Sequence, residues 1–281
     1  MPDDTFDAEW LELREPVDHR SRAEVLLDPL RQHWGDRRWS RILDLGSGTG
    51  SNLRYLAPRL PGPQRWTLLD HDPSLLKQAH QSSRSILSTA VRVQPVVGRL
   101  ETEGLERAAH VDLVTASALL DLVSEAWLRG LVSRCQSVSA GVLLALSYDG
   151  RIRWHGPPDP DDEWIQERVN EHQLRDKGTG AALGPRAGEV AADHLRRAGY
   201  RCTLVPSPWR LGPDDSALTR RLMEGWVEAV GELDPDDLPR ARGWLGRRRA
   251  GLDREGGDLE VGHVDLLALP PSTPFSRRAA P

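Results

Sequence analysis

Apolar runs and amphipathic stretches alternate along the first half of the chain. Five short runs of apolar residues predict strands, at 40–45, 66–70, 91–97, 111–116 and 141–149. The segments between them with helical spacing predict helices, at 51–60, 73–84 and 124–136. The runs show little alternation with polar residues, which is typical of strands buried on both faces, so the rhythm predicts a doubly wound, mostly parallel α/β sheet. Pro95 indicates that the third strand lies at an edge.

The pattern changes on either side of this region. After a polar stretch at 151–184, the later elements are predicted as helix 186–198, strand 200–206, helices 216–232 and 237–254, and strand 261–270. Residues 5–35 predict a helical segment that is broken at Pro16. We expect a single domain over 1–281, with an N-terminal helical cap at 1–36, lid or substrate segments at 151–184 and 207–258, and a flexible tail at 271–281.

Composition narrows the class of protein. The chain is 38% hydrophobic, enough for a core, but no apolar run approaches the length of a membrane span. The acidic N-terminus has no apolar stretch typical of a signal peptide. Cys135 and Cys202, far apart, fit neither a zinc site nor a disulfide framework and suit a reducing cytoplasm. We therefore expect a cytoplasmic protein without a bound metal. The net charge of -5 argues against a nucleic-acid partner, and the oligomeric state stays open.

The stretch RILDLGSGTGSN at 41–52 carries the first chemical signal. Its glycines follow the pattern G-x-G-x-G, one residue shorter than the dinucleotide pattern G-x-G-x-x-G. Asp44 lies two residues before the first glycine, where a negative charge opposes a pyrophosphate and suits an ammonium or sulfonium group. Asp70 ends the second strand, at the position where an acid accepts hydrogen bonds from a ribose diol. These features favour a nucleoside with a positive group over NAD.

Together, DLGSGTGSN and LLDHDP resemble the class I methyltransferases that use S-adenosyl-L-methionine, over about residues 40–150. The resemblance implies a Rossmann-like, seven-stranded, mostly parallel sheet whose last strand, 261–270, is antiparallel. It places Asp70 on the ribose hydroxyls and His71 beside the adenine. At the methionine end of the cofactor it places Asp44, Gly46, Ser47, Gly48, Gly50 and Asn52.

The same resemblance assigns the rest of the cofactor pocket. Ala116 and Ser117 would line it next to the sulfonium. The segment VGRLE at 97–101 takes the place of the adenine-reading turn, where the family often has an acid. Arg99 cannot accept a hydrogen bond, so either the backbone of Arg99 and Leu100 or the side chain of Glu101 reads the adenine.

The methyl acceptor is expected at the carboxyl ends of the strands. His172 is the first candidate for a general base, followed by Asp121 and Asp176; on a helix, His172 and Asp176 share one face. The candidate substrate-binding residues are Arg14, Arg22, Tyr148, Lys177 and Trp209. A carboxylate acceptor would need no base, and Arg14, Arg22 or Lys177 would anchor it. The alternative for each charged residue is an ordinary ion pair or helix-end contact.

The predicted function is in-line transfer of a methyl group to an oxygen or nitrogen, less readily a carbon, of a small-molecule metabolite. No N-P-P-Y or D-P-P-Y motif follows the fourth strand, which argues against methylation of nucleobases or glutamine. Three alternatives stay open: a non-catalytic protein that binds the same cofactor, a polyamine-type aminopropyl transferase, and an NAD-binding oxidoreductase on a related fold.

Overall fold

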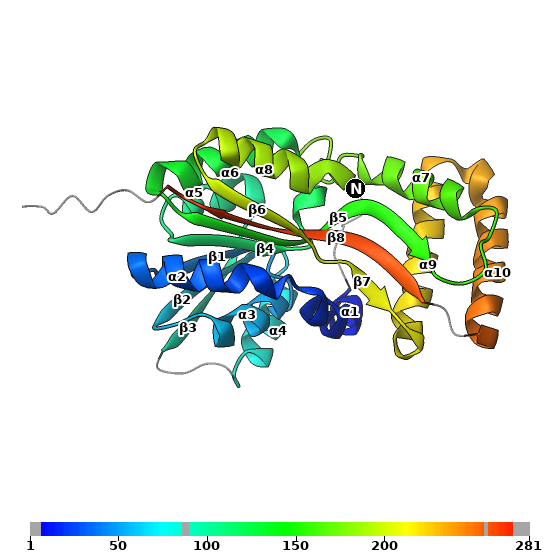
Figure 1. Cartoon of the computed structure of the whole chain (residues 1–281), viewed down its shortest axis with the longest axis horizontal. Helices are drawn as coiled ribbons and strands as arrows, with labels where there is room; N and C mark the ends of the chain where they lie inside the picture. The colour runs from blue at the N-terminus through cyan, green and yellow to red at the C-terminus, as the bar shows by residue number, and fades with distance from the viewer. Residues whose placement is uncertain (1–6, 86–89, 256–257, 272–281) are drawn as a thin grey trace, which may run out of the picture.

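The computed structural model describes residues 7–85, 90–255 and 258–271 (Figure 1). Its sheet has eight strands in the order β3-β2-β1-β4-β5-β8-β6, with β7 paired to β8. The parallel strands are β1 (Arg41–Leu45), β2 (Gln64–Asp70), β3 (Val91–Val97), β4 (Leu113–Ser117) and β5 (Gly141–Trp154). The strand β8 (Leu259–Leu269) runs antiparallel to β5, β6 (Arg201–Pro206) and β7 (Trp209–Leu211). The predicted fold class, with its antiparallel last strand and β3 at an edge, is confirmed; β7 is an eighth strand that was not predicted.

Helices cover both faces of the sheet (Figure 1). One face carries α2 (Leu27–Arg37), α3 (Ser51–Leu56) and α4 (Pro73–Ser82). The other carries α5 (Leu105–Ala108), α6 (Glu125–Val138) and α8 (Ala187–Arg197). Each face has its own apolar core, one around Trp34 and Trp66 and the other around Trp127 and Leu128. Burial of the sheet on both faces explains why its strands lack alternation.

A third core extends the molecule beyond the carboxyl ends of the parallel strands. Strand β5 is 14 residues long and β8 is 11, and both continue into a lobe with α7 (Asp162–Gln173), α9 (Ser216–Leu233) and α10 (Leu238–Glu255), on the right in Figure 1. Trp226 and Trp244 lie at the centre of this core. The prediction ended the fifth strand at 149 and began a polar stretch at 151, so the end of β5 up to Trp154 was missed.

The N-terminal helix α1 (Ala8–Ser21) contains Pro16, so the break predicted at that proline is wrong. The helix begins at the cap residue Asp7, whose side chain accepts from the Glu9 amide, and the chain turns only at Arg22 and Ala23, before α2. This turn brings α1 under the carboxyl ends of the strands in Figure 1.

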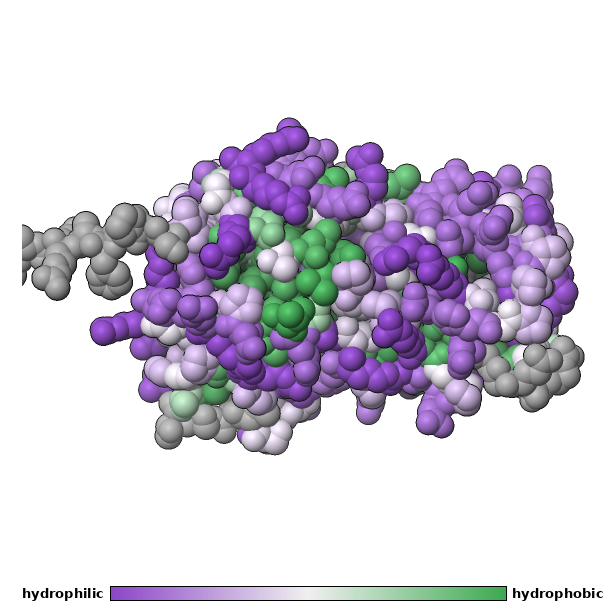
Figure 2. All heavy atoms as spheres, viewed as in Figure 1, coloured by the Kyte–Doolittle hydropathy of each residue, from purple (hydrophilic) through white to green (hydrophobic). Residues whose placement is uncertain are grey.

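The surface in Figure 2 is mostly charged or polar, with an apolar area beside β6 and α2. Across the described part of the chain, no helix combines the length and apolar character needed to span a bilayer. Of the predicted tail at 271–281, only Pro271 is among the described residues.

Candidate active site

The glycine turn joins β1 to α3. Gly46, Gly48 and Gly50 have φ angles of 59°, 51° and 81°, a left-handed region that L side chains rarely adopt, which is why the sequence needs glycine there. The Ser47 amide donates to the Leu69 carbonyl at 3.1 Å, so the turn is fixed to the neighbouring strand. The result is a tight loop at the carboxyl edge of the sheet.

Asp70 holds this turn from the end of β2. Its carboxylate accepts from the amide of Gly48 at 2.8 Å and from the amide of Asp72 at 3.0 Å. The His71 Nδ1 lies 3.4 Å from the same carboxylate, while the His71 side chain is mostly exposed. Each carboxylate oxygen keeps a second lone pair for a ligand hydroxyl.

Asp44 lies behind the turn and is fully buried. Its Oδ1 accepts from Asn52 Nδ2 at 2.7 Å, and Asn52 also donates to Thr115 Oγ1 at 3.1 Å. Burial raises the pKa of Asp44 to about 7, against the hydrogen bond of Asn52 and the charge of Arg22, which lower it. The other carboxylate oxygen, Oδ2, has no partner, and neither does the buried hydroxyl of Ser47. Unpaired buried polar atoms are costly and mark a place that a polar ligand can satisfy.

The segment after β3 is anchored to α6 and to itself. The Leu100 carbonyl accepts from Trp127 Nε1 at 2.9 Å, and the Arg99 amide donates to the Glu103 carboxylate at 2.9 Å. The Arg99 side chain extends toward Glu101, with 3.7 Å between Nε and Oε2. The segment begins at the end of β3, where Val97 pairs with Asp70 of β2. It therefore lies beside Asp70, where the predicted role in adenine binding requires it.

Strand β4 ends in a strained turn. Ala116 is buried, Ser117 is half-buried, and Ala118 has a φ of 52°. Leu146, within β5, has the same φ of 52°. Each left-handed non-glycine residue costs on the order of 1 kcal/mol or more, and such strain gathers at functional sites.

Asp121 follows this turn, in the short helix η4 (Leu120–Leu122). Its side chain is buried and its Oδ1 has no partner. Burial raises its pKa to about 6, against backbone amides including that of Tyr148 and the charge of Arg14, which lower it. A carboxyl group with this pKa accepts protons at neutral pH.

Arg14, Tyr148, Trp209 and His263 gather around the same place. Arg14 donates through Nε and Nη2 to the Asp18 carboxylate at 2.9 and 3.2 Å, and its guanidinium lies 5.0 Å from the ring of Trp209. The Trp209 ring lies 4.9 Å from that of His263, which in turn lies 6.2 Å from that of Tyr148. Burial lowers the pKa of His263 to about 3, so its imidazole is neutral. Three of the predicted substrate residues, Arg14, Tyr148 and Trp209, are thus brought together near Asp121.

The segment after α7 has a different environment. His172 Nε2 lies 2.9 Å from Glu232 Oε2 and so links α7 to α9. Asp176 lies beyond the end of α7, so the predicted shared helical face with His172 is wrong. Its Oδ1 accepts from the amides of Gly178 and Gly180, at 2.7 and 2.9 Å, and closes a turn. The hydrogen bond with His172 lowers the pKa of Glu232, and the charge of Lys177 adds to this effect. These contacts hold the α7–α9 junction and bring none of the three residues to Asp44 or Asp121.

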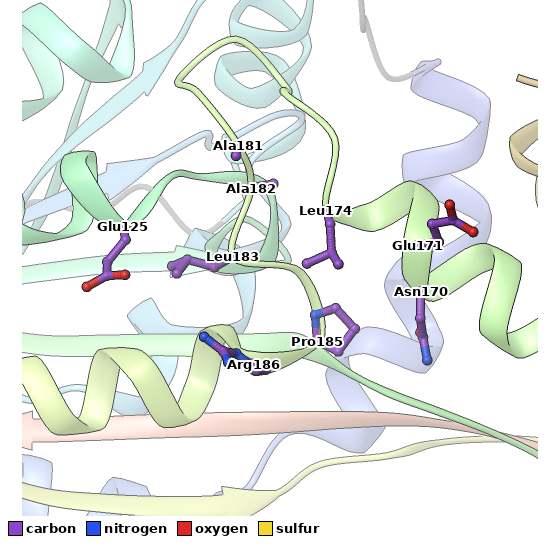
Figure 3. Close-up of a pocket in the computed structure, with 9 residues that line it drawn as sticks. All are labelled: Glu125, Asn170, Glu171, Leu174, Ala181, Ala182, Leu183, Pro185 and Arg186. Atoms are coloured by element: carbon purple, nitrogen blue, oxygen red, sulfur yellow. The ribbon is translucent and has the colours of Figure 1, made fainter. Parts of the chain in front are cut away.

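A cavity of ≈ 430 Å³ opens between the end of α7 and the start of α6 (Figure 3). It is lined by Glu125, Asn170, Glu171, Leu174, Ala181, Ala182, Leu183, Pro185 and Arg186. None of these is a predicted site residue. Its connection to the group around Asp121 is Asn170, which accepts from the Tyr148 hydroxyl at 2.9 Å.

Sequence analysis did not identify Asp265 or Asp18. Asp265, on β8, accepts from the amides of Ala23 and Leu146 at 3.0 and 2.8 Å, and lies 3.4 Å from Arg22 Nε. The signal that could have found it is an acid inside the apolar run VDLLALP. Asp18 accepts from Arg14 and from Trp209 Nε1, the latter at 3.1 Å.

Residues 42–140 match the sequence model of a family described as methyltransferase domain. No curated protein matches the chain. Among solved structures, the YcgJ protein from Bacillus subtilis is 14% identical, with 89% of this chain and 100% of that chain covered and a TM-score of 0.47. A SAM-dependent methyltransferase from Geobacter sulfurreducens, in complex with S-adenosyl-L-homocysteine, is 16% identical, with 94% and 99% covered and a TM-score of 0.45. One from Thiobacillus denitrificans, in the same kind of complex, is 18% identical, with 94% and 99% covered and a TM-score of 0.42.

Proposed function

We propose that this chain is a class I methyltransferase that depends on S-adenosyl-L-methionine, and that it transfers the methyl group to a proton-bearing oxygen or nitrogen of a small molecule. The methyltransferase domain at 42–140, the strand order and the glycine turn support the class. The observation that carries the acceptor chemistry is the buried carboxyl group of Asp121, whose Oδ1 lacks a partner.

The residues of the turn fit the cofactor. Asp44 Oδ2 and Ser47 Oγ are buried without partners, so they suit the amino-acid end of the cofactor, where an ammonium group donates hydrogen bonds. Asp70 keeps lone pairs for the ribose hydroxyls. When bound, the cofactor supplies a methyl group on a sulfonium that is already reactive. The protein then contributes alignment of the acceptor and exclusion of water.

Asp121 is our choice for the general base. A hydroxyl or ammonium acceptor must lose a proton, and a base is most effective when its pKa lies near the working pH. Asp121 has a pKa of about 6 and comes directly after the β4 turn that is predicted to line the sulfonium. His172 is the weaker choice because its contact with Glu232 lies at the α7–α9 junction, away from the turn after β4.

The charges around the site favour an acceptor with a proton over a carboxylate. Of the three cations that the sequence offered as carboxylate anchors, Arg14 already binds Asp18 and Arg22 binds Asp265. Lys177 belongs to the α7–α9 junction, beside Glu232. An additional carboxylate would therefore compete with existing buried ion pairs, whereas an N–H or O–H group would satisfy Asp121.

The cover over the site favours a small acceptor. Leu11 on α1 lies over the glycine turn: its Cδ1 would be 3.2 Å from a Cβ placed on Gly48. Leu119 lies equally close to Gly46, at 3.1 Å. Because α1 lies over the turn and packs against Trp209 of β7, this cover favours a metabolite over a macromolecular acceptor.

The proposal is tested in two steps. Cofactor with a radiolabelled methyl group is first incubated with the protein and pools of small amines, alcohols and thiols, to find an acceptor. The transfer rate at saturating cofactor is then measured against pH for the parent, D121N and H172A. We expect the parent rate to rise with pH through about 6, where Asp121 becomes ionised, and D121N to lose this rise and about 10²–10⁴-fold in rate. H172A should keep both. A parental rate in D121N would refute the base, and label found only in protein or nucleic acid would refute the small acceptor.

A further inference from the structure

A chain of buried polar side chains runs from β8 to Asp44. Asp265 and Arg22 form an ion pair at 3.4 Å, and Arg22 Nη1 donates to Asn52 Oδ1 at 2.9 Å. Asn52 Nδ2 then donates to Asp44 Oδ1 at 2.7 Å. All four residues are buried. Since water and salt do not screen buried groups well, each partner feels the charge of the next.

Arg22 decides which way the amide of Asn52 points. A guanidinium group only donates hydrogen bonds, so it faces Asn52 Oδ1 and leaves Nδ2 for Asp44 and Thr115. Turning the amide by half a rotation would place its NH₂ against the guanidinium and its oxygen against the carboxylate. Both contacts would be repulsive, so the orientation of Asn52 depends on Arg22.

Arg22 itself is fixed by its surroundings. Its guanidinium lies over the ring of Tyr55, 4.5 Å from the ring centre. Asp265, its carboxylate partner, also accepts from the amides of Ala23 and Leu146 and from the Ser207 hydroxyl, at 3.0, 2.8 and 2.6 Å. The strained turn at Leu146 in β5 and the start of α2 are thereby tied to the same carboxylate.

We propose that Arg22 is a positioning residue for cofactor binding: held by Asp265, it orients Asn52, which presents the carboxylate of Asp44 to the positive end of the cofactor. This role replaces the substrate contact that the sequence predicts for Arg22, and it rests on the proposed assignment of Asp44. Arg22 acts through Asn52 and touches no reacting atom.

The positive charge of Arg22 also affects the protonation of Asp44. Three neighbours act on the pKa of this carboxyl group besides burial: Asn52 and Arg22 lower it, and Asp70 raises it. Removing the charge of Arg22 therefore moves the pKa above its present value of about 7. Asp44 would then be mostly protonated at neutral pH and would attract a cation less.

The test is a calorimetric titration with S-adenosylhomocysteine between pH 6 and 9, using the parent, R22M and R59M. We expect R22M to bind at least about tenfold more weakly at pH 7 and the pH midpoint of binding to rise by about one unit. R59M is the matched control: Arg59 lies over the same Tyr55 ring, 4.1 Å from its centre, and donates to the Tyr55 carbonyl instead of Asn52. It should bind within about twofold of the parent, since it leaves the contacts of Asn52 intact.

Two outcomes would overturn the proposal: a folded R22M with parental affinity and midpoint, or an equal loss in R59M. If R22M does not fold, N52L decides, because it keeps the ion pair of Arg22 and Asp265 and removes the side chain that links Arg22 to Asp44, together with its contact to Thr115. Parental affinity in N52L would refute the role of Arg22. The titration contains no acceptor, so it is independent of the proposed acceptor chemistry. Parental binding by D44N would instead refute the assignment of Asp44.

Discussion

Asp44 is the acidic residue of the candidate site whose surroundings most disfavour its charged form. Its charged form is disfavoured because the side chain is fully buried and one carboxylate oxygen has no partner. A carboxyl group in this position is costly for the fold alone, so its cost is consistent with a role in binding. Ionisation of Asp44 is therefore expected to raise the affinity for the cofactor and to lower the stability of the free protein.

For affinity, the cation of the ligand prefers the ionised carboxylate. Since the folded pKa of Asp44 is about 7, we expect the affinity for S-adenosylhomocysteine to rise between pH 6 and 8 and then to level off. D44N should bind weakly and without this dependence. Calorimetry at several pH values measures both, and a parental pH profile in D44N would contradict the expectation.

Ionisation of Asp44 has the opposite effect on the stability of the fold. The pKa of Asp44 is raised from 3.8 to about 7 in the fold, so its contribution to stability is complete below pH 3.8 and is lost as the pH rises through about 7. At pH 8, D44N should therefore be more stable than the parent without ligand, by at most about 4 kcal/mol. Urea unfolding at pH 8 and at pH 5 checks this: the difference should shrink at the lower pH. A D44N protein less stable than the parent at pH 8 would refute it.

The residues that the sequence identified are those whose role is local. Asp44 and Asp70 lie at fixed distances from the glycines of one turn, so one segment of sequence identifies them. Asp265 could not be found in this way, because its partner Arg22 is 243 residues distant. For the same reason the sequence could not show that His172 contacts Glu232, which lies on another helix. A contact between residues distant in sequence becomes visible only in the fold.

At the scale of elements, α1 controls access to the glycine turn. Leu11 approaches Gly48, and Glu15 pairs with Arg54 of α3, so the helix is attached to the turn by apolar and ionic contacts. His19 Nε2 also lies 3.0 Å from the Ser51 hydroxyl at the start of α3. We therefore expect a cofactor that binds on this turn to displace Leu11.

L11A should therefore speed cofactor entry. We expect the association rate of S-adenosylhomocysteine to increase about twofold to tenfold, because removing the side chain opens the space over Gly48. Stopped-flow tryptophan fluorescence measures this rate, with the neighbouring Trp10 as a reporter. L13A is the control, since it changes the same residue type on the same helix at a side chain that is 36% exposed. Equal rates in L11A and L13A would show that Leu11 is no barrier.

Elements with a strong internal pattern were predicted well, and those defined by tertiary pairing were not. The strands β1 to β4 and the helices α8 to α10 match their predicted spans within a few residues, because apolar periodicity alone determines them. Strand β7 has three residues and exists through its pairing with β8, so it leaves no periodic signal. Helix α7 was not predicted, because the stretch 151–184 is polar and its helical packing depends on distant parts of the chain. The turn that the Asp176 side chain closes after this helix also leaves no periodic signal.

At the scale of the whole molecule, β5 and β8 connect the parallel part of the sheet to the helical lobe. Both strands run from the core around Trp127 to the core around Trp244, and their pairing shifts register after Leu144 and after Tyr148. Asp159 and Asp161, just before α7, and Asp162, its first residue, form ion pairs with arginines of α10, which closes the far end of the lobe. The lobe shares its two central strands with the sheet, so we expect the chain to unfold as one unit.

The variant W244A tests whether the chain unfolds as one unit. Trp244 is fully buried, donates from Nε1 to the Asp162 carboxylate at 2.9 Å, and packs 6.1 Å from the Trp226 ring. Its removal should cost about 3–5 kcal/mol, and the loss should lower the midpoints of far-UV circular dichroism and of S-adenosylhomocysteine binding together. W164A is the control: Trp164 is only half-buried, under Arg240 at 4.1 Å, and should cost less. If the lobe of W244A instead melts first and leaves ligand binding intact, the lobe is a separate unit and its strands do not transmit stability to the cofactor site.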